Sequence, residues 1–235
     1  MVTTLLSTFY PENVLGLHVN MAGALTTGGI VKGYVAQIPG LKYLMADKSD
    51  FEKVDGLFPR LGYLLQESGY MHIQGTKPDT VGVGLSNSPL GLAAYILEKF
   101  STWTNKSWRE LQDGGLENNH PISKDKMLTN VMIYWITNSI TSSMRYYKEN
   151  FSAYNSAVDN TPIQVPTGFA DFPEELMRIP RFQMRGKFPN LVQYSTMEAG
   201  GHFAAMEVPS ILAKDIIKFV DIVEKQPMKH GKDEI

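Results

Sequence analysis

Two polar side chains stand where an acid–base pair could form. His202 lies in a Gly-Gly-His turn after a predicted strand that ends near Met197, and Glu175 follows another predicted strand that ends near Gly168. Active sites of open α/β sheets lie beyond the carboxyl ends of the strands, so the two side chains can meet there. A carboxylate that holds an imidazole in one tautomer lets that imidazole take a proton. The pair therefore indicates the acid–base part of a catalytic triad.

Other interpretations of these residues stay open. Asp171 and Glu174 are close enough in the sequence to replace Glu175 as the acid. A histidine after two glycines is also common as a simple turn residue. The His-x-His and His-Glu-x-x-His patterns do not occur, and we expect no metal site. Of the remaining histidines, we expect His18 and His72, which lie in apolar surroundings, to be core groups. We expect His120 and His230 to be exposed.

The composition argues against several classes of protein. The 235 residues include 22 Lys and Arg against 24 Asp and Glu, a net charge of −2, so we expect no nucleic-acid partner. They include no cysteine, which excludes thiolate nucleophiles. Phosphate-binding glycine motifs do not occur, so we expect no nucleotide cofactor. No apolar run approaches the ~20 residues of a membrane span, and the first residues lack a signal-peptide layout.

The two ends of the chain show the alternation of a parallel α/β sheet. A helix that ends before Pro11 precedes a predicted strand over 14–21, and further strands are predicted over 161–167 and 189–197. A helix over 209–225 follows, with apolar residues spaced by three and four. Strand, loop and helix in turn favour an α/β fold with a parallel sheet.

The middle of the chain is predicted to be mainly helical. Ser88 and Pro89 form a helix start, with Ser88 as the N-cap and apolar residues at helical spacing as far as Phe100. A second helix begins at Ser123 or Lys124 and runs toward residue 147. The remaining expectations are a loop over 23–40, a helix over 51–66 and a turn over 82–84.

These elements divide the chain into three parts and a tail. A helical insertion within an α/β sheet commonly forms a lid over an active site. We therefore expect a core helix and strand over 1–21, a helical lid over 22–150, the rest of the core over 151–225 and a disordered tail over 226–235.

Four long motifs carry a resemblance to a known family. The stretch GYMHIQGTKPDTVGVGLSNSPLGLAAYILEKFSTWTN (69–105) is followed in order by MRYYKEN, VPTGFADFPEEL and EAGGHFAAMEVP. Together they resemble the epoxide hydrolases of the microsomal type, most nearly the insect juvenile hormone epoxide hydrolases. The resemblance implies an α/β-hydrolase fold with a helical lid and no cofactor. It also implies a lipophilic epoxide such as juvenile hormone as substrate, with water as the second reactant.

The resemblance assigns a role to four residues. In this family an Asp attacks an epoxide carbon and forms an alkyl-enzyme ester, while two lid tyrosines hydrogen-bond the epoxide oxygen. By motif, Tyr70 and Tyr147 match the tyrosines, Glu175 matches the acid and His202 matches the base that activates water. A phenol with a pKa of ~10 is acidic enough to donate and stays protonated at neutral pH. Taken alone, either tyrosine is more often a packing residue, and Tyr146 is a neighbour that competes with Tyr147.

The departures from the family are as informative as the matches. The GGDWG-like nucleophile elbow and the HGWP-like loop do not occur in the sequence, and neither does the N-terminal membrane anchor that the family carries. We therefore expect the chain to correspond to the C-terminal half of an epoxide hydrolase and to be inactive alone. The resemblance implies the endoplasmic reticulum, or microsomal membrane, as the location of the full-length family.

Two alternatives to an epoxide hydrolase stay open. The first is a non-catalytic, lid-bearing remnant that binds an apolar ligand, an idea motivated by the missing nucleophile. The second and weaker one is an ester hydrolase, which requires a serine elbow that the sequence does not contain. A pair of phenol donors favours epoxide over ester chemistry, because backbone N–H groups usually serve esters.

Overall fold

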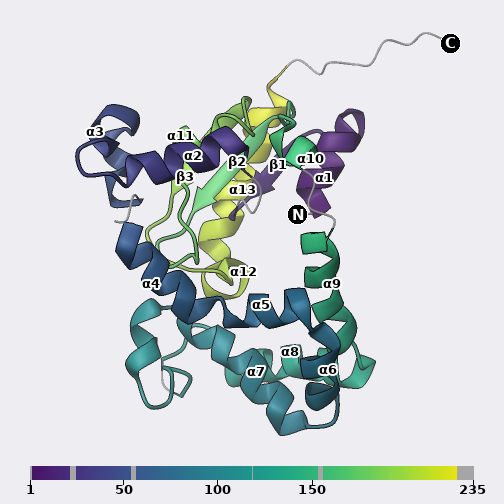
Figure 1. Cartoon of the computed structure of the whole chain (residues 1–235). Coiled ribbons are helices and arrows are strands. Elements are labelled where there is room, and N and C mark those ends of the chain that lie inside the picture. Colours follow the sequence, from purple (N-terminus) through teal and green to yellow (C-terminus); the bar gives the residue numbers. More distant parts are fainter. Residues whose placement is uncertain (1, 22–24, 54–56, 118, 153–155, 227–235) are drawn as a thin grey trace, which may run out of the picture. The chain divides into compact units, whose positions relative to one another are not determined.

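The chain folds into two compact units (Figure 1). The computed structural model describes residues 2–21, 25–53, 57–117, 119–152 and 156–226. We call Met1–Leu57 with Asn155–Ile235 the sheet unit, and Phe58–Tyr154 the helical unit. This division differs from the expected segments, because residues between 25 and 57 belong with the sheet. The function of the helical unit as a lid stays a prediction.

In its described residues, the sheet unit is built on three parallel strands in the order β1-β2-β3 (Figure 1). The parallel sheet expected from the alternation of elements is therefore confirmed. Alternate residues face opposite sides of a strand, so His18 and Gly168 share one face and Leu17 and Phe169 the other. The strands are β1 (Leu17–Val19), β2 (Thr167–Asp171) and β3 (Leu191–Thr196).

Helices pack on both faces of this sheet. On one face Phe219 lies against Gly168, where an added Cβ would lie 2.7 Å from the phenylalanine ring. The opposite face carries the main core, formed by Leu17, Phe169 and Met184 with their neighbours. The helices of this unit are α1 (Val2–Phe9), α2 (Thr27–Ala36), α3 (Lys42–Met45), α10 (Ser156–Asn160), α11 (Arg181–Met184), α12 (Ala204–Glu207) and α13 (Pro209–Glu224), with short 3-10 helices η1 (Pro11–Asn13) and η2 (Lys48–Lys53).

Two sequence predictions for the sheet unit are wrong. Residues 27–36, expected as a loop, form α2, which Thr26 caps by accepting the Gly29 N–H. The glycines there allow close packing, since a Cβ on Gly29 would lie 2.5 Å from the carbonyl oxygen of Gln183. The strand expected over 161–167 instead begins at residue 167 and runs to residue 171, buried along its whole length. The tail over 227–235 lies outside the described residues.

The helical unit consists of packed helices without a strand among its described residues. Its main core joins α7, α8 and α9 through Leu92, Val131, Ile140 and Met144, and α6 packs against it through Val81 and Leu85. The helices are α4 (Leu57–Glu67), α5 (Gly69–Thr76), α6 (Pro78–Ser86), α7 (Pro89–Thr102), α8 (Lys124–Thr137) and α9 (Ile140–Ser152), with the 3-10 helix η3 (Lys106–Glu110).

The structure confirms one helix prediction here and corrects two. The helix α7 begins after Ser88, whose hydroxyl accepts the Gly91 N–H as an N-cap. The single helix expected from residue 124 toward 147 is two helices, because Asn138 adopts the left-handed conformation (φ 50°) that ends α8. The turn expected over 82–84 lies inside α6, where Gly82 lets the helix approach Thr141 of α9.

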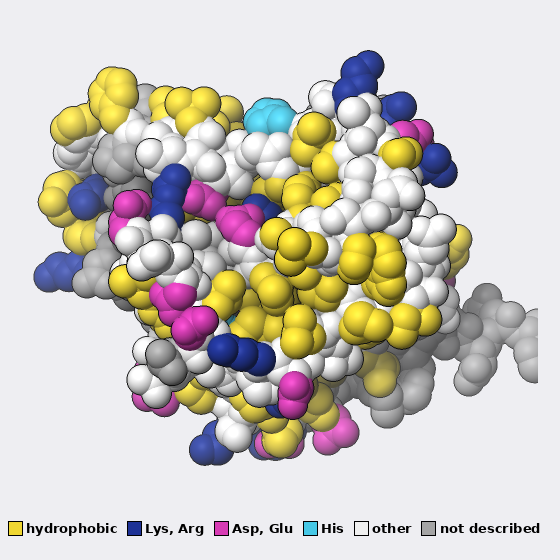
Figure 2. All heavy atoms as spheres, turned by 90° about the horizontal axis from the view of Figure 1, so that it is seen from below, with side chains coloured by type: hydrophobic (Ala, Val, Ile, Leu, Met, Phe, Trp, Pro, Cys, Tyr) yellow, Lys and Arg dark blue, Asp and Glu magenta, His cyan; other side chains and the backbone are white. Residues whose placement is uncertain are grey.

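Two features of the helical unit concern its surface. Among the described residues, no single helix is long and apolar enough to span a membrane, and α6 and α7 pass that test only as a pair bent by 119°. Figure 2 shows hydrophobic side chains gathered on one face of the molecule. On α8, Met132 and Ile136 are exposed while Met127 and Val131 are buried, so only one side of this helix contributes to the core.

Candidate active site

An acid–base pair lies beyond the carboxyl ends of β2 and β3. Glu175 follows β2 and His202 follows β3, and the two loops are joined by a parallel bridge between Glu174 and Gly201. The His202 Nδ1 atom lies 2.7 Å from Glu175 Oε1. An ionised carboxylate only accepts, so the Nδ1–H donates and the lone pair of the ring falls on Nε2. This is the tautomer that a general base needs.

The carboxyl group of Glu175 is arranged to hold a charge against the imidazole. Its side chain is only 2% exposed, whereas that of His202 is 27% exposed. Glu175 Oε1 also accepts the Leu176 N–H at 2.7 Å, and Oε2 has no hydrogen-bond partner among the described residues. The carboxylate therefore presents one oxygen to His202 Nδ1, the arrangement that orients an imidazole.

The structure separates the competing acids. Asp171 is paired with Arg178 at 2.7 Å and with Lys53 at 3.2 Å, so its carboxylate is engaged away from His202. The main chain of Glu174 donates to the Gly200 carbonyl at 3.1 Å. Of the three acids that the sequence left open, Glu175 lies within hydrogen-bonding distance of the His202 Nδ1 atom.

Lys53 lies at the centre of a cluster of buried charged side chains at the end of β2. Its ammonium lies 3.0 Å from Asp50 Oδ1, 3.2 Å from Asp171 Oδ2 and 2.9 Å from the Tyr194 hydroxyl. Burial, with the nearby carboxylates, raises the pKa of the Tyr194 phenol. The hydroxyl therefore stays protonated and donates to the Ile179 carbonyl at 3.0 Å. The cluster connects the segment before α4 to the end of β2.

A second carboxylate, Glu207, holds the turn that carries His202. Its Oε2 accepts the Gly201 N–H at 2.9 Å and its Oε1 accepts the Phe203 N–H at 2.8 Å. Burial raises the pKa of Glu207 to about 7, and the Glu175 charge adds to the rise, while the two N–H bonds and His202 oppose it. Gly200 has a φ of +104°, which favours glycine at this position. The sequence prediction missed Glu207, although it follows His202 by only five residues.

The two predicted tyrosines lie in contact within the helical unit. Tyr70 of α5 and Tyr147 of α9 have ring centroids 6.0 Å apart at an interplanar angle of 83°. Burial raises the pKa of the Tyr147 phenol, with smaller contributions from Tyr134 and Tyr95, so this phenol stays a proton donor at neutral pH. The neighbouring Tyr146 is 48% exposed.

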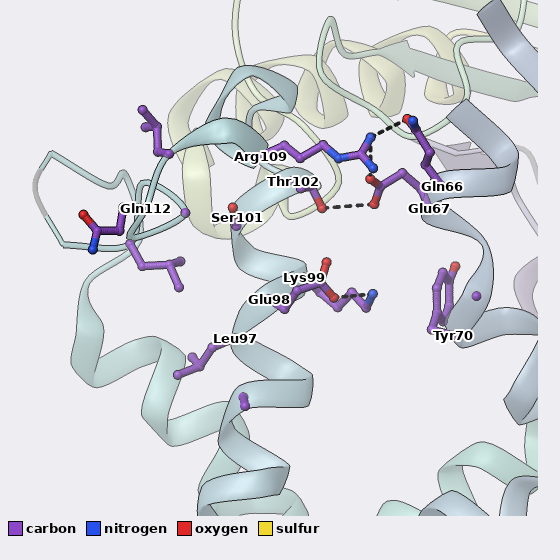
Figure 3. Close-up of a pocket in the computed structure, with 15 residues that line it drawn as sticks. Gln66, Glu67, Tyr70, Leu97, Glu98, Lys99, Ser101, Thr102, Arg109 and Gln112 are labelled. Atoms are coloured by element: carbon purple, nitrogen blue, oxygen red, sulfur yellow. Dashed lines mark hydrogen bonds and ion pairs between the residues drawn. The ribbon is translucent and has the colours of Figure 1, made fainter. Parts of the chain in front are cut away.

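Tyr70 also borders a cavity of about 680 Å³ in the helical unit. Figure 3 shows Lys99 directed toward the tyrosine ring, and the ammonium lies 4.7 Å from the ring centroid. The Trp103 ring packs edge-on against Tyr70 at 5.0 Å. Across the cavity, Arg109 pairs with Glu67 at 3.1 Å (Figure 3). The cavity walls therefore carry several charged groups beside Tyr70.

The other histidines do not join either pair. His18 is a satisfied group, as predicted, because its Nε2 lies 2.8 Å from Asp215 Oδ2. The prediction for His72 is wrong, because this residue is exposed. The prediction for His120 is also wrong, because this residue is partly buried and its Nε2 lies 2.9 Å from the Phe100 carbonyl oxygen. His230 lies outside the described residues. No group of three His, Cys, Asp or Glu side chains suited to a metal ion is found within the described part of the chain.

Comparisons with curated proteins point to one family. No protein-family model matches the chain. Epoxide hydrolase 1 from Oryctolagus cuniculus is 48% identical, over 96% of this chain and 50% of that protein. Juvenile hormone epoxide hydrolase 2 from Ctenocephalides felis is 45% identical, over 99% of this chain and 50% of that protein.

Solved structures agree with the sequence comparisons. The crystal structure of juvenile hormone epoxide hydrolase from the silkworm Bombyx mori matches with a TM-score of 0.88 at 42% identity, over 94% of this chain and 52% of that one. The structure of Aspergillus niger epoxide hydrolase matches with a TM-score of 0.69 at 26% identity, over 94% of this chain and 49% of that one. The chain therefore has the α/β-hydrolase fold of the epoxide hydrolases.

Within that class the assignment is narrower. The chain is a homologue of the microsomal and juvenile hormone epoxide hydrolases, as its four motifs predict. It spans about half the length of the curated relatives that it matches.

Proposed function

We propose that this chain supplies the epoxide-activating and ester-hydrolysing residues of an enzyme that converts lipophilic epoxides, such as juvenile hormone, to diols. Tyr70 and Tyr147 donate hydrogen bonds to the epoxide oxygen while an Asp carboxylate attacks a ring carbon and the carbon–oxygen bond breaks. Glu175 and His202 then activate the water that hydrolyses the resulting alkyl-enzyme ester. Water supplies the oxygen that regenerates the Asp carboxylate and releases the diol.

The observation that carries this proposal is the contact between the two tyrosines. An opening epoxide develops an alkoxide charge, and donors placed where charge develops lower the barrier. The 6.0 Å separation of the ring centroids brings two phenols to one place from different helices. The raised pKa of Tyr147 favours this role, because the phenol must carry its proton when the epoxide arrives.

The Glu175–His202 pair supports the second half of the reaction. Hydrolysis of an ester needs a base that takes a proton from water and a group that stabilises the imidazolium formed. The 2.7 Å contact suits both requirements, since the acceptor on His202 is then Nε2. These residues cover epoxide activation and ester hydrolysis, whereas the attacking Asp belongs to an elbow motif that the 235 residues do not contain. We therefore expect no turnover from these residues alone.

The same homology supports a proposal for the location. We place the enzyme at the endoplasmic reticulum membrane, because the microsomal epoxide hydrolases are its homologues. Fractionation of the source tissue tests this, and recovery of the protein only in the cytosolic supernatant would contradict it.

The function can be tested with protein expressed from its complete transcript and a juvenile hormone epoxide as substrate. We expect Tyr147→Phe to lower diol formation about 10²–10³-fold, the usual effect of removing one donor from a developing oxyanion. His202→Gln should stop diol release while the covalent ester accumulates and is seen as added protein mass. Tyr146→Phe is the matched control and should leave the rate unchanged, since that phenol is exposed.

Two outcomes would refute the assignment. Undiminished turnover in both Tyr147→Phe and His202→Gln would remove these residues from the reaction. Saturable binding of the epoxide with neither ester nor diol would favour the alternative, a non-catalytic protein that binds an apolar ligand.

A further inference from the structure

The turn that carries His202 is held by a carboxylate that the proposed reaction does not use. Both oxygens of Glu207 are engaged, Oε2 with the Gly201 N–H at 2.9 Å and Oε1 with the Phe203 N–H at 2.8 Å. These N–H groups belong to the residues on either side of His202. The carboxylate therefore fixes the main chain immediately before and after the imidazole.

The same turn is held from the opposite side by the loop of Glu175. The Glu174 N–H donates to the Gly200 carbonyl at 3.1 Å, and Glu174 pairs with Gly201 in a parallel bridge. The main chain around His202 is thus held by two restraints. One is the bridge to Glu174, and the other is the Glu207 side chain, which can change its charge. Loss of that side chain leaves the bridge in place but frees the Gly201 and Phe203 N–H groups.

We propose that Glu207 is a positioning residue for His202, and that its ionised carboxylate fixes the turn so that the imidazole keeps its contact with Glu175. The inference deepens the proposed function and rests on it. Glu207 touches neither substrate nor water in this account. It acts by holding the base within the 2.7 Å distance of its acid.

Protonation of Glu207 loosens this restraint. An ionised carboxylate accepts with both oxygens, but a protonated one has a hydroxyl that donates, so only one of the two N–H bonds keeps a good acceptor. The charged groups that act on Glu207 are Glu175, which raises its pKa, and His202, which lowers it. With burial the pKa reaches about 7, so the carboxyl is ionised above that pH and protonated below it. The turn is therefore tight in mildly alkaline solution and loosens as the pH falls through 7.

The first test is nuclear magnetic resonance on the labelled protein between pH 5.5 and 8.5. In His202→Gln, which removes the titration of the imidazole, we expect the Gly201 and Phe203 amide shifts and the Glu207 carboxyl carbon to change with one shared midpoint. This midpoint should lie somewhat above pH 7, because His202 lowers the Glu207 pKa in the wild type. In Glu207→Gln we expect no such midpoint, and at least one of these amides should exchange with solvent more than tenfold faster at pH 8. Glu198→Gln changes an exposed carboxylate nearby and should match the wild type.

The second test separates the two chemical steps in a single turnover. We expect Glu207→Gln to slow ester hydrolysis about 10–100-fold at pH 8 while the rate of ester formation changes less than threefold. Glu207→Asp keeps the charge on a shorter side chain and should recover part of the loss. If Glu207→Gln does not fold, the titration in His202→Gln and the kinetics of Glu207→Asp decide the question.

The outcomes distinguish this proposal from the proposed function. Equal amide exchange in Glu207→Gln and the wild type would overturn the positioning role, and so would an unchanged rate of ester hydrolysis. If the wild-type protein forms neither ester nor diol, the proposed function fails, and the resonance experiments still decide whether Glu207 holds the turn.

Discussion

Replacing Glu175 by Gln gives the most direct measure of the acid–base pair. The amide keeps the size of the side chain and one hydrogen bond to the imidazole, but it removes the negative charge 2.7 Å from Nδ1. The charge matters when His202 takes a proton from water, because the imidazolium then lies beside a carboxylate that is only 2% exposed.

The size of the loss follows from Coulomb's law. Two opposite unit charges about 4 Å apart attract by about 4 kcal/mol at the effective dielectric constant of about 20 that suits such sites. Each ~1.4 kcal/mol changes a rate tenfold, and the retained hydrogen bond offsets part of the loss. We therefore expect Glu175→Gln to slow ester hydrolysis about 10²–10³-fold. Ester formation should change less than threefold, because the base has no part in that step.

The assay is a single turnover followed by rapid quenching, with ester and diol measured by mass spectrometry. Asp171→Asn is the informative companion variant, since Asp171 is the nearby acid that pairs with Lys53 and Arg178. It should lower the melting temperature but leave the ratio of the two rates unchanged. Ester hydrolysis within threefold of the wild type in Glu175→Gln, or the selective loss of that step in Asp171→Asn, would refute the reasoning.

Three further predictions concern stability and are measured by thermal unfolding. Lys53→Met leaves two buried carboxylates without their ammonium partner. It should lower the free energy of unfolding by about 3–5 kcal/mol and the melting temperature by roughly 6–20 °C. An unchanged melting temperature would show that the cluster does not stabilise the fold. Gly82→Ala should destabilise the protein by about 1–3 kcal/mol, because the new Cβ would lie 2.6 Å from the Thr141 hydroxyl. Gly84→Ala in the same helix meets nothing within 4 Å and should be neutral or stabilising. Equal effects of the two variants would contradict the close approach of α6 to Thr141. Leu92→Ala should cost about 2–5 kcal/mol, since this side chain is 0% exposed, and a loss below 1 kcal/mol would place Leu92 outside the core.

Local chemistry made some elements predictable. The start of α7 is determined by neighbouring residues, because Ser88 caps the first turn and Pro89 suits its first position. The helix α13 begins at Pro209, as its apolar stripe predicts. The Glu175–His202 pair follows from a general property of parallel sheets, which brings the loops after adjacent strands together.

Features that depend on distant partners were not predictable. The glycines in α2 favour a loop when the sequence is considered alone, and only the structure shows that they pack against Gln183. The sequence around Asn138 does not indicate that this residue ends α8. The two tyrosines became candidates only through the family resemblance, because the packing of α5 on α9 joins segments far apart in the sequence. Glu207 was missed because its hydrogen bonds are to main-chain groups, which every residue offers.

The bridge between Glu174 and Gly201 has a consequence for how this protein can diverge. Because main-chain atoms align the two loops, amino-acid replacements that spare Gly200, Glu207 and the acid–base pair itself can accumulate without breaking the bridge. A single inserted or deleted residue between Asp171 and Glu175, by contrast, shifts one loop against the other by a full register step. Insertions and deletions are therefore expected outside this short stretch, in connections that take no part in the bridge.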